Sequence, residues 1–417
     1  MSIRMKTIFM GLALAVVTLP VFSAPTITIT APVITFSGNN ALLSGNGAQL
    51  DAALNAMFTG ANKAQFDLAI ANMQTQANTE LGKYGSQEKL ALGFANANNY
   101  SAQSATLQGY QGYKLFSLMG GVMIGAQLPS FNPAELTAIP DTIAEHPDIY
   151  AGFAPSLSFN LGVHPSAIIG IFNKDLGKSL EKFYMNVKYG TLSYTYPTAA
   201  QGDIKMNTVN FGLGLNYQWI APGKSFLWGL AKWRGVNFGT GINYQSNKVT
   251  FSTDIAEISQ AYSQTTPAGA LPAAQIGTVT TTLAGTPKVN LGLEMTTTSI
   301  PLEATTSIQM LWLLNLNLGA GVDLVFGKTD ITADSGSSFT ARDMTVSVAG
   351  VTQTVHSTVV PGTIKLDAST KGINPSLARM RLMTGFGVQL GPVKIDVPIY
   401  YYFNTGLALG VSAGIVW

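Results

Sequence analysis

Few side chains in this chain could do covalent or metal chemistry. Cysteine is absent, which excludes disulfides and thiolate sites. The only histidines are His146, His164 and His356. Glu145 precedes His146, but such a pair is more typical of a solvated loop, and no histidine has a serine or aspartate at a spacing that indicates a nucleophile and its base. We therefore predict that the protein is not an enzyme and has no catalytic residue, no metal site and no cofactor.

Two arginines that could bind a ligand lie on a segment in which apolar and polar residues alternate. Residues 378–417 contain three segments in which apolar and small or polar residues alternate with period two, as in a β-strand with one apolar and one polar face. Arg379 and Arg381 lie on the polar face of the first segment. If Gly391-Pro392 is a two-residue hairpin turn, the apolar faces of the two strands lie on one side of the hairpin and their polar faces on the other. The expected cross-strand pairs are Leu390 with Val393, Gln389 with Lys394 and Gly387 with Asp396.

The same alternation recurs from residue 115 onward, most clearly over 209–219. A soluble sandwich would also alternate, but segments of roughly ten residues and only 11% charged residues favour strands that cross a bilayer. We predict an all-β membrane protein, a transmembrane antiparallel β-barrel with an even number of strands, about 12 to 14. Expected exposed loops are 129–148, 254–277 and 329–376. The last contains a hairpin-like piece at 346–355, which is either a pair of barrel strands or a protruding loop. Glycines on the polar face, such as Gly212 and Gly239, leave room for a plug or for close strand packing.

The N-terminal quarter differs from the rest. Arg4 and Lys6 precede an apolar run at 8–19, which predicts a signal peptide over 1–23. Residues 26–30 alternate like a short strand. Two apolar stripes with helical spacing follow, whereas 90–113 shows no clear period. The stripes consist of Leu50, Ala53, Leu54, Met57 and Phe58, and of Phe66, Ala69, Ile70 and Met73. We expect 24–113 to be a partly helical segment that plugs the barrel lumen or lies in the periplasm, and 114–417 to be the transmembrane β-barrel.

The end of the chain resembles bacterial outer-membrane β-barrels. Trp417 is an aromatic last residue preceded by alternating apolar residues, which is similar to the C-terminal signature of those proteins. The resemblance implies the bacterial outer membrane as the location, outer-membrane lipid around the barrel, and recognition of the last strand by the barrel assembly machinery. The net charge of +2 offers no electrostatic case for nucleic acid as a partner.

The whole chain also resembles the FadL-type family of hydrophobic-compound transporters. The resemblance consists of a signal peptide, an apolar-striped N-terminal segment, many strands and a lumen without a ring of like charge. The family's Asn-Pro-Ala precedes the first strand, whereas here Asn132-Pro133-Ala134 follows the segment at 115–128.

The FadL-type resemblance implies passive uptake of hydrophobic small molecules such as long-chain fatty acids. The apolar plug surface would then comprise Leu50, Leu54, Phe58 and Phe66, and Arg379 or Arg381 would meet a carboxylate head group. The alternatives are a general diffusion porin and a structural or adhesive barrel that displays its extracellular loops.

Overall fold

The fold is given by a computed structural model. It describes residues 23–37, 47–58, 63–82, 88–103, 115–129, 150–198, 202–223, 225–226, 228–254, 258–265, 277–285, 288–348 and 351–417. Apart from Ser23, the predicted signal peptide lies outside the described residues. Within them, no helix combines the length and the apolar composition that a membrane crossing needs.

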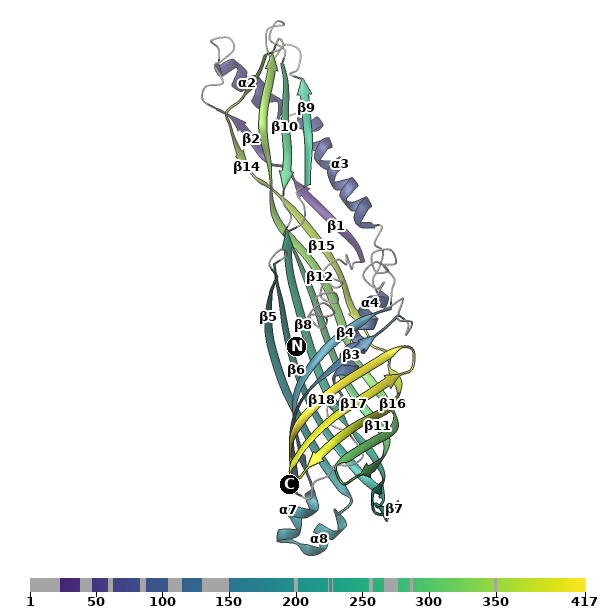
Figure 1. Ribbon diagram of the computed structural model, residues 1–417. Coiled ribbons are helices and arrows are strands. Elements are labelled where there is room, and N and C mark those ends of the chain that lie inside the picture. The colour runs from purple at the N-terminus through teal and green to yellow at the C-terminus, as the bar shows by residue number, and fades with distance from the viewer. Residues whose placement is uncertain are drawn as a thin grey trace.

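A closed antiparallel ring forms one half of the molecule (Figure 1). Each strand pairs with the next along the ring, and the ring closes where the C-terminal strand pairs with the first ring strand. In the described residues the ring comprises ten strands: β3 (Phe116–Gln127), β4 (Gly152–Val163), β5 (Phe183–Thr198), β6 (Gly202–Ile220), β8 (Ala231–Asp254), β11 (Lys288–Met310), β12 (Leu314–Val348), β16 (Ala378–Leu390), β17 (Val393–Tyr402) and β18 (Gly406–Val416). The predicted antiparallel barrel is confirmed, with an even strand number.

The ring has fewer strands than the 12 to 14 expected, because several strands are very long. β12 has 35 residues, β8 has 24 and β11 has 23. On one side of β12, the partner is β16 over 314–324 and then β15 (Gly362–Ile373) over 329–339. On the other side, the partner is β11 over 314–335 and then β10 (Gly277–Gly285) over 339–348. The predicted strand number assumed that these residues form additional strands in the membrane. Instead, they extend β8, β11 and β12 beyond the ring.

The predicted loop at 329–376 is therefore wrong, because most of it forms strands. The piece at 346–355 is a hairpin, in which Val348 pairs with Val351 of β13 (Val351–Thr354). The segment at 254–277 also contains a strand, β9 (Ile258–Thr265), which pairs with β10. Most of the predicted loop at 129–148 lies outside the described residues.

The apolar faces of the ring point outward, as the alternation predicts. Phe211 and Leu213 of β6 are exposed, whereas Asn210 and Asn216 on the other face of the same strand are buried. The hairpin of β16 and β17 has the predicted register, with Leu390 opposite Val393 and the other two pairs as expected. A two-layer core would have buried these apolar side chains against one another, so the structure is a barrel and not a sandwich.

One end of the ring, here called the base, carries short connections and the C-terminus (Figure 1). There β16 and β17 join through residues 391–392, and α7 (Pro165–Phe172), α8 (Lys174–Ser179) and β7 (Ser225–Phe226) lie at the same end. Large aromatic side chains at the base project into the surroundings. The strongly exposed tryptophans are Trp228, Trp312, Trp417 and Trp219. Such a girdle is typical of the interface between membrane and water.

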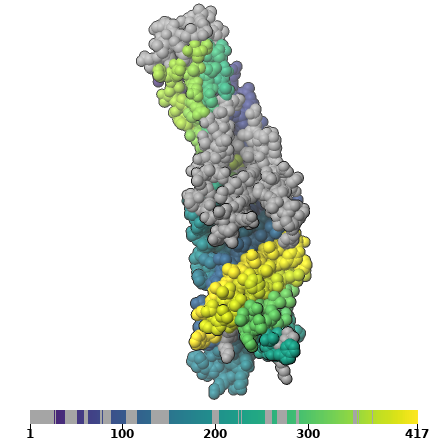
Figure 2. Space-filling view, in the orientation of Figure 1, coloured from purple at the N-terminus to yellow at the C-terminus, as the bar shows by residue number. Residues whose placement is uncertain are grey.

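Beyond the opposite end of the ring lies an elongated part that we call the distal module (Figures 1 and 2). It comprises the extension of β12, the strand β15, and β1 (Ser23–Thr30), β2 (Val33–Phe36), α2 (Gly47–Met57), α3 (Lys63–Gly82), β9, β10, β13 and β14 (Ser357–Val360). β1 pairs with β15, and β2 pairs with β14. The predicted strand at 26–30 and the two predicted helices are confirmed by β1, α2 and α3. Their apolar side chains form one core with Tyr262, Val279 and Phe339 of the strands.

Candidate functional site

The helix α4 (Glu88–Ser101) fills the barrel near the end that faces the distal module. It packs against β3, β4, β8, β11, β12, β15 and β18, which surround it. Every residue from Leu90 to Ser101 is buried except Leu92, which is half-buried. The segment shows no amphipathic stripe because its polar side chains are buried as completely as its apolar ones. That is why the sequence predicted no helix here.

Glycines let the backbone of α4 lie directly on the barrel wall. A Cβ atom added at Gly125 of β3 would come within 2.2 Å of the carbonyl oxygen of Ala97. At Gly152 of β4, it would lie 2.3 Å from the carbonyl oxygen of Gly93. Contacts this close to backbone atoms exclude any larger residue, so these positions require glycine.

The glycines singled out in the sequence serve a different purpose. A Cβ atom at Gly212 would meet Asn243 and Lys188, and one at Gly239 would meet Glu303 and Asn216. These neighbours belong to the wall itself. Gly212 and Gly239 therefore accommodate side chains of adjacent strands and not α4.

Asn98 has the most extensive contacts between α4 and the wall. Its Nδ2 donates to the backbone oxygen of Gln245 at 3.2 Å and to Oγ1 of Thr297 at 2.9 Å. Its Oδ1 accepts from Nε2 of Gln245 at 3.3 Å and from Nδ2 of Asn247 at 2.7 Å. Both functions of one fully buried amide are thus used on strands β8 and β11. This arrangement fixes the rotation and the height of α4 in the lumen.

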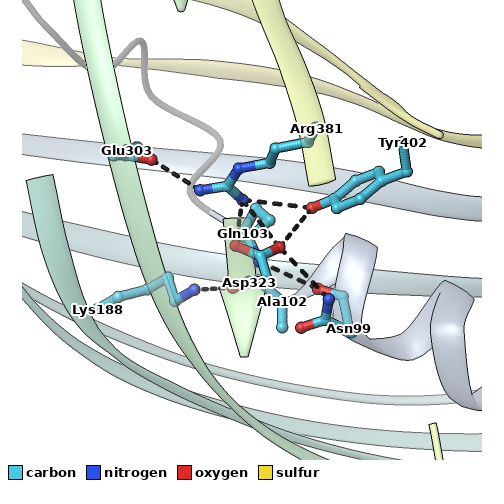
Figure 3. A network of polar contacts seen from close by, with 8 residues as sticks. All are labelled: Asn99, Ala102, Gln103, Lys188, Glu303, Asp323, Arg381 and Tyr402. Atoms are coloured by element: carbon cyan, nitrogen blue, oxygen red, sulfur yellow. Dashed lines mark hydrogen bonds and ion pairs between the residues drawn. The ribbon is translucent and has the colours of Figure 1, made fainter. Parts of the chain in front are cut away.

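A buried charge cluster joins the end of α4 to the four strands β11, β12, β16 and β17 (Figure 3). Asp323 of β12 is fully buried, and its Oδ2 accepts from Arg381 at 3.2 Å, from the Tyr402 hydroxyl at 3.1 Å and from Gln103 at 3.1 Å. Arg381 also pairs with Glu303 of β11 at 2.7 Å. One cation is thus held between two carboxylates, which compensates part of the cost of burying all three charges. Gln103, just after α4, is attached to this cluster.

A second polar cluster surrounds Tyr100 of α4. Its hydroxyl donates to Oε1 of Gln127 at 2.8 Å and accepts from Nε of Arg379 at 2.9 Å. Arg379 also donates to Gln127 at 2.7 Å and to the hydroxyl of Tyr150 at 3.0 Å. The Tyr100 ring stacks on Tyr402, with centroids 3.9 Å apart. Aromatic stacking and a charge-assisted network therefore hold the same side chain.

Below α4, toward the base, the lumen holds a polar cavity. Its lining includes Gln103, Asn186, Asn243, Glu303 and Tyr400. The described lumen charges occur mostly in pairs of opposite sign, as Lys394 with Asp396 at 3.1 Å illustrates, and they form no ring of like charge. Within the described ranges, no group of three or more histidine and acidic side chains could hold a metal ion.

The predicted site residues fall into two separate places. Arg379 and Arg381 lie in the lumen, where tyrosine, glutamine and carboxylate groups already accept their hydrogen bonds. Leu54, Phe58 and Phe66 are buried in the core of the distal module, which lies beyond the ring. Leu50 belongs to α2, and its side chain lies outside the described residues. The predicted apolar surface and the arginines therefore do not meet. Of the two positions considered for the N-terminal segment, the lumen is occupied by α4, whereas α2 and α3 belong to the distal module.

Sequence reasoning missed the residues that join α4 to the wall, notably Asn98, Tyr100 and Gln103. A signal for them exists in the composition. Four residues of α4, at 96–99, include three asparagines, which is an unusual run within a helix because asparagine has a low helix propensity. Such a run is favourable where the amides find partners, and Gln245 and Asn247 alternate on the polar face of a strand. That these two segments lie side by side is visible only in the structure.

Solved structures of outer-membrane barrels share the general architecture at very low sequence identity. The translocator domain of autotransporter NalP from Neisseria meningitidis is 10% identical, with 74% of this chain and 90% of that chain covered and a TM-score of 0.27. The Pseudomonas putida toluene transporter TodX is 8% identical, with 78% and 98% covered and a TM-score of 0.23. A Pseudomonas aeruginosa FadL homologue is 9% identical, with 78% and 97% covered and a TM-score of 0.21. Likeness at this level carries no argument about function.

Family membership rests on the sequence as a whole. No curated protein matches the chain. The family model described as Lsa36-like matches residues 41–417, which includes α2, α3, α4 and the entire ring. Because this match spans most of the chain, the protein belongs to the Lsa36-like family.

Proposed function

We propose that the barrel anchors the distal module in the outer membrane and displays it at the cell surface. The observation that carries this proposal is the continuity of the strands. β12 has 35 residues, whereas roughly ten suffice for a tilted strand to cross a bilayer. At about 3.4 Å per residue, such a strand is about 120 Å long, against a hydrocarbon core of about 30 Å. The wall of the barrel thus continues directly into the module that it carries.

Two features support an extracellular position for the distal module. The exposed tryptophans and the C-terminus lie at the base, whereas the longest excursions of the chain leave the opposite end, and in outer-membrane barrels the longer loops are extracellular. The module also has its own apolar core of helices on strands, with Phe58, Phe66 and Tyr262 in mutual ring contact. A module with a core of its own holds its shape in water, as a displayed structure must.

Closure of the lumen by α4 also favours display over a permanently open pore. The helix is buried on all sides, and its polar groups form hydrogen bonds with at least five wall residues. These contacts favour a closed lumen over the open lumen of a general diffusion porin. A steady aqueous pore would need the space that α4 occupies.

Passive uptake of a hydrophobic small molecule, such as a long-chain fatty acid, is the second candidate function. The observation that favours it is a helix held inside a barrel, the arrangement expected of a plugged transporter. The apolar contacts of α4 with Leu293, Met295 and Ile331 offer a greasy surface at the mouth of the lumen. Below this surface the cavity is polar, so a hydrophobic ligand would have to leave through the wall.

The absence of cysteine makes the display proposal directly testable. Gln65→Cys places a thiol on an exposed position of α3, and Asp175→Cys places the matched control on an exposed position of α8 at the base. Intact cells are treated with a membrane-impermeant maleimide. We expect the variant at 65 to be labelled and the variant at 175 to react only after lysis. Labelling of the base alone would overturn the orientation and the display function with it.

The two candidate functions differ in what crosses the membrane. Purified protein in planar bilayers should show almost no steady conductance under either proposal, whereas a general porin would conduct continuously. Cells that produce the protein should take up a labelled long-chain fatty acid no faster than cells without it if the barrel serves display. Uptake that depends on the protein would support the second candidate.

A further inference from the structure

The connection between β4 and β5 forms a helical hairpin at the base, made of α7 and α8 (Figure 1). None of the eight residues of α7 is buried. Its largest apolar side chains are among the most exposed in the protein, with Phe172 at 86% and Ile171 at 76%. Ile168 of α7 and Leu176 of α8 are exposed as well. A water-facing hairpin would turn such residues inward.

The two helices pack on each other through glycine instead of through their large apolar residues. A Cβ atom at Gly177 of α8 would lie 2.6 Å from Cα of Gly170 and 3.2 Å from the backbone oxygen of Ser166. The contact between the helices is therefore backbone on backbone. Because the glycines occupy the contact between the helices, Ile168, Ile171 and Phe172 face outward, which is favourable if the surroundings are apolar.

The hairpin is held in a defined position on the barrel rim by His164. This buried residue directly precedes α7, and its backbone N–H donates to the oxygen of Leu115 at 3.0 Å. Its Nδ1 lies 2.6 Å from Oγ of Ser166, and its Nε2 lies 3.1 Å from the backbone oxygen of Glu181, just after α8. The ring also makes an edge contact with Tyr184. The start and the end of the hairpin are thus tied together, so its apolar face has a fixed direction.

The apolar face continues an apolar surface on the wall. The strands that flank the hairpin expose Phe159, Leu161, Met185 and Val187, which face outward where lipid surrounds the barrel. Lysines accompany the apolar residues of the hairpin at a spacing of four, at positions 174, 178 and 182, and all three are exposed. Asp175 and Glu181 lie among them, which leaves a positive excess. Apolar residues beside lysines are typical of helices that lie in the headgroup region of an anionic bilayer.

We propose that the α7–α8 hairpin is an interfacial membrane anchor. It inserts Ile171 and Phe172 at the boundary between headgroups and acyl chains of the periplasmic leaflet, and its lysines contact anionic phospholipid headgroups. The occupant of the apolar face is thus a phospholipid surface. The anchor fixes the tilt and the depth of the barrel at one side of its rim. This inference does not depend on whether the barrel serves display or uptake.

The test uses the full-length protein, which contains no native cysteine. Phe172→Cys and Asp175→Cys are each labelled with an environment-sensitive fluorophore and folded into vesicles of phosphatidylethanolamine and phosphatidylglycerol. We expect the probe at 172 to be quenched by brominated acyl chains and shielded from aqueous iodide. The probe at 175 should show the reverse pattern. Ile171→Cys provides a second position if the variant at 172 does not fold into the barrel.

Two outcomes would overturn the proposal. If iodide quenches the probes at 172 and 175 equally, the apolar face lies in water. If neither brominated lipid nor iodide reaches position 172, a protein surface, from a second copy or another protein, covers it.

The role of charge is tested by replacing the three lysines with glutamine in the labelled protein. Quenching at 172 should rise with the phosphatidylglycerol fraction in the protein with its lysines and lose that dependence in the triple variant. An equal dependence in both would exclude the headgroup contact.

Discussion

Replacing Asn98 by alanine tests whether polar contacts hold α4 in the lumen. Asn98→Ala removes one buried amide that makes four hydrogen bonds to Gln245, Asn247 and Thr297. The alanine methyl group fits within the space left, and alanine has the highest helix propensity. Any loss of α4 stability therefore comes from the contacts with the wall and not from the helix itself.

The expected size of the effect follows from those contacts. A neutral hydrogen bond contributes a net of about 0.5–1.5 kcal/mol. Two of the four bonds are long, at 3.2 and 3.3 Å, so each contributes near the lower limit of that free-energy range. The loss for local opening of α4 is then about 2–4 kcal/mol. Since 1.4 kcal/mol corresponds to a factor of ten, the open population should rise about 30- to 700-fold.

Hydrogen exchange measured by mass spectrometry reports this population directly. Peptides that cover 88–103 should exchange faster by that factor in Asn98→Ala than in the unmodified protein. Asn290→Ala is the matched control, because Asn290 is an exposed wall asparagine that accepts one bond, from Ser252 at 2.7 Å. It should change exchange of α4 by less than about threefold. Exchange of α4 that is equal in the two variants would refute the view that the amide of Asn98 holds the helix.

Three further predictions concern the charge cluster, the wall and the distal module. Arg381→Met should destabilise the barrel toward urea by about 3–5 kcal/mol, because Asp323 stays buried without its cation. Gly125→Ala should accelerate exchange of α4, since its Cβ meets helix backbone, whereas Gly336→Ala, which has open space around it, should not. Burial raises the pKa of Tyr262 from its ordinary value of 10.0 to about 12. The raised pKa means that folding favours the neutral phenol, so its contribution is complete below pH 10 and lost as the pH rises toward 12. Tyr262→Phe should therefore lose less circular dichroism than the unmodified protein over that range.

The barrel could be predicted from the sequence because a single physical rule governs most of it. Each strand presents one face to lipid and the other to a wet interior, so alternation is strong, as in Phe211, Leu213 and Leu215 against Asn210 and Asn216. The hairpin at Gly391-Pro392 was predictable to the residue for the same reason, since one register alone matches the faces of both strands.

The position of α4 and the length of the strands depend on contacts that alternation does not encode. A helix that is buried on all sides has no water-facing stripe, so Asn96 to Asn99 read as a loop. β12 keeps its strand pattern beyond the membrane because β15 replaces β16 as its partner on one side and β10 replaces β11 on the other. Alternation against water and alternation against lipid look alike in sequence, and this is why the strand number was overestimated.

The path of the chain limits how the lumen could open. α4 follows the distal module in sequence, and after Gln103 the chain continues to β3, which starts at the base, where the Leu115 N–H donates to the oxygen of Trp417 at 2.8 Å. The helix is therefore attached to structures at both ends of the ring. Withdrawal in one direction would pull the start of β3 into the lumen, and withdrawal in the other would pull on the distal module. An open lumen would require α4 to give up its contacts with Asp323, Gln127 and Gln245. A helix attached in this way is better suited to hold barrel and module together than to act as a gate.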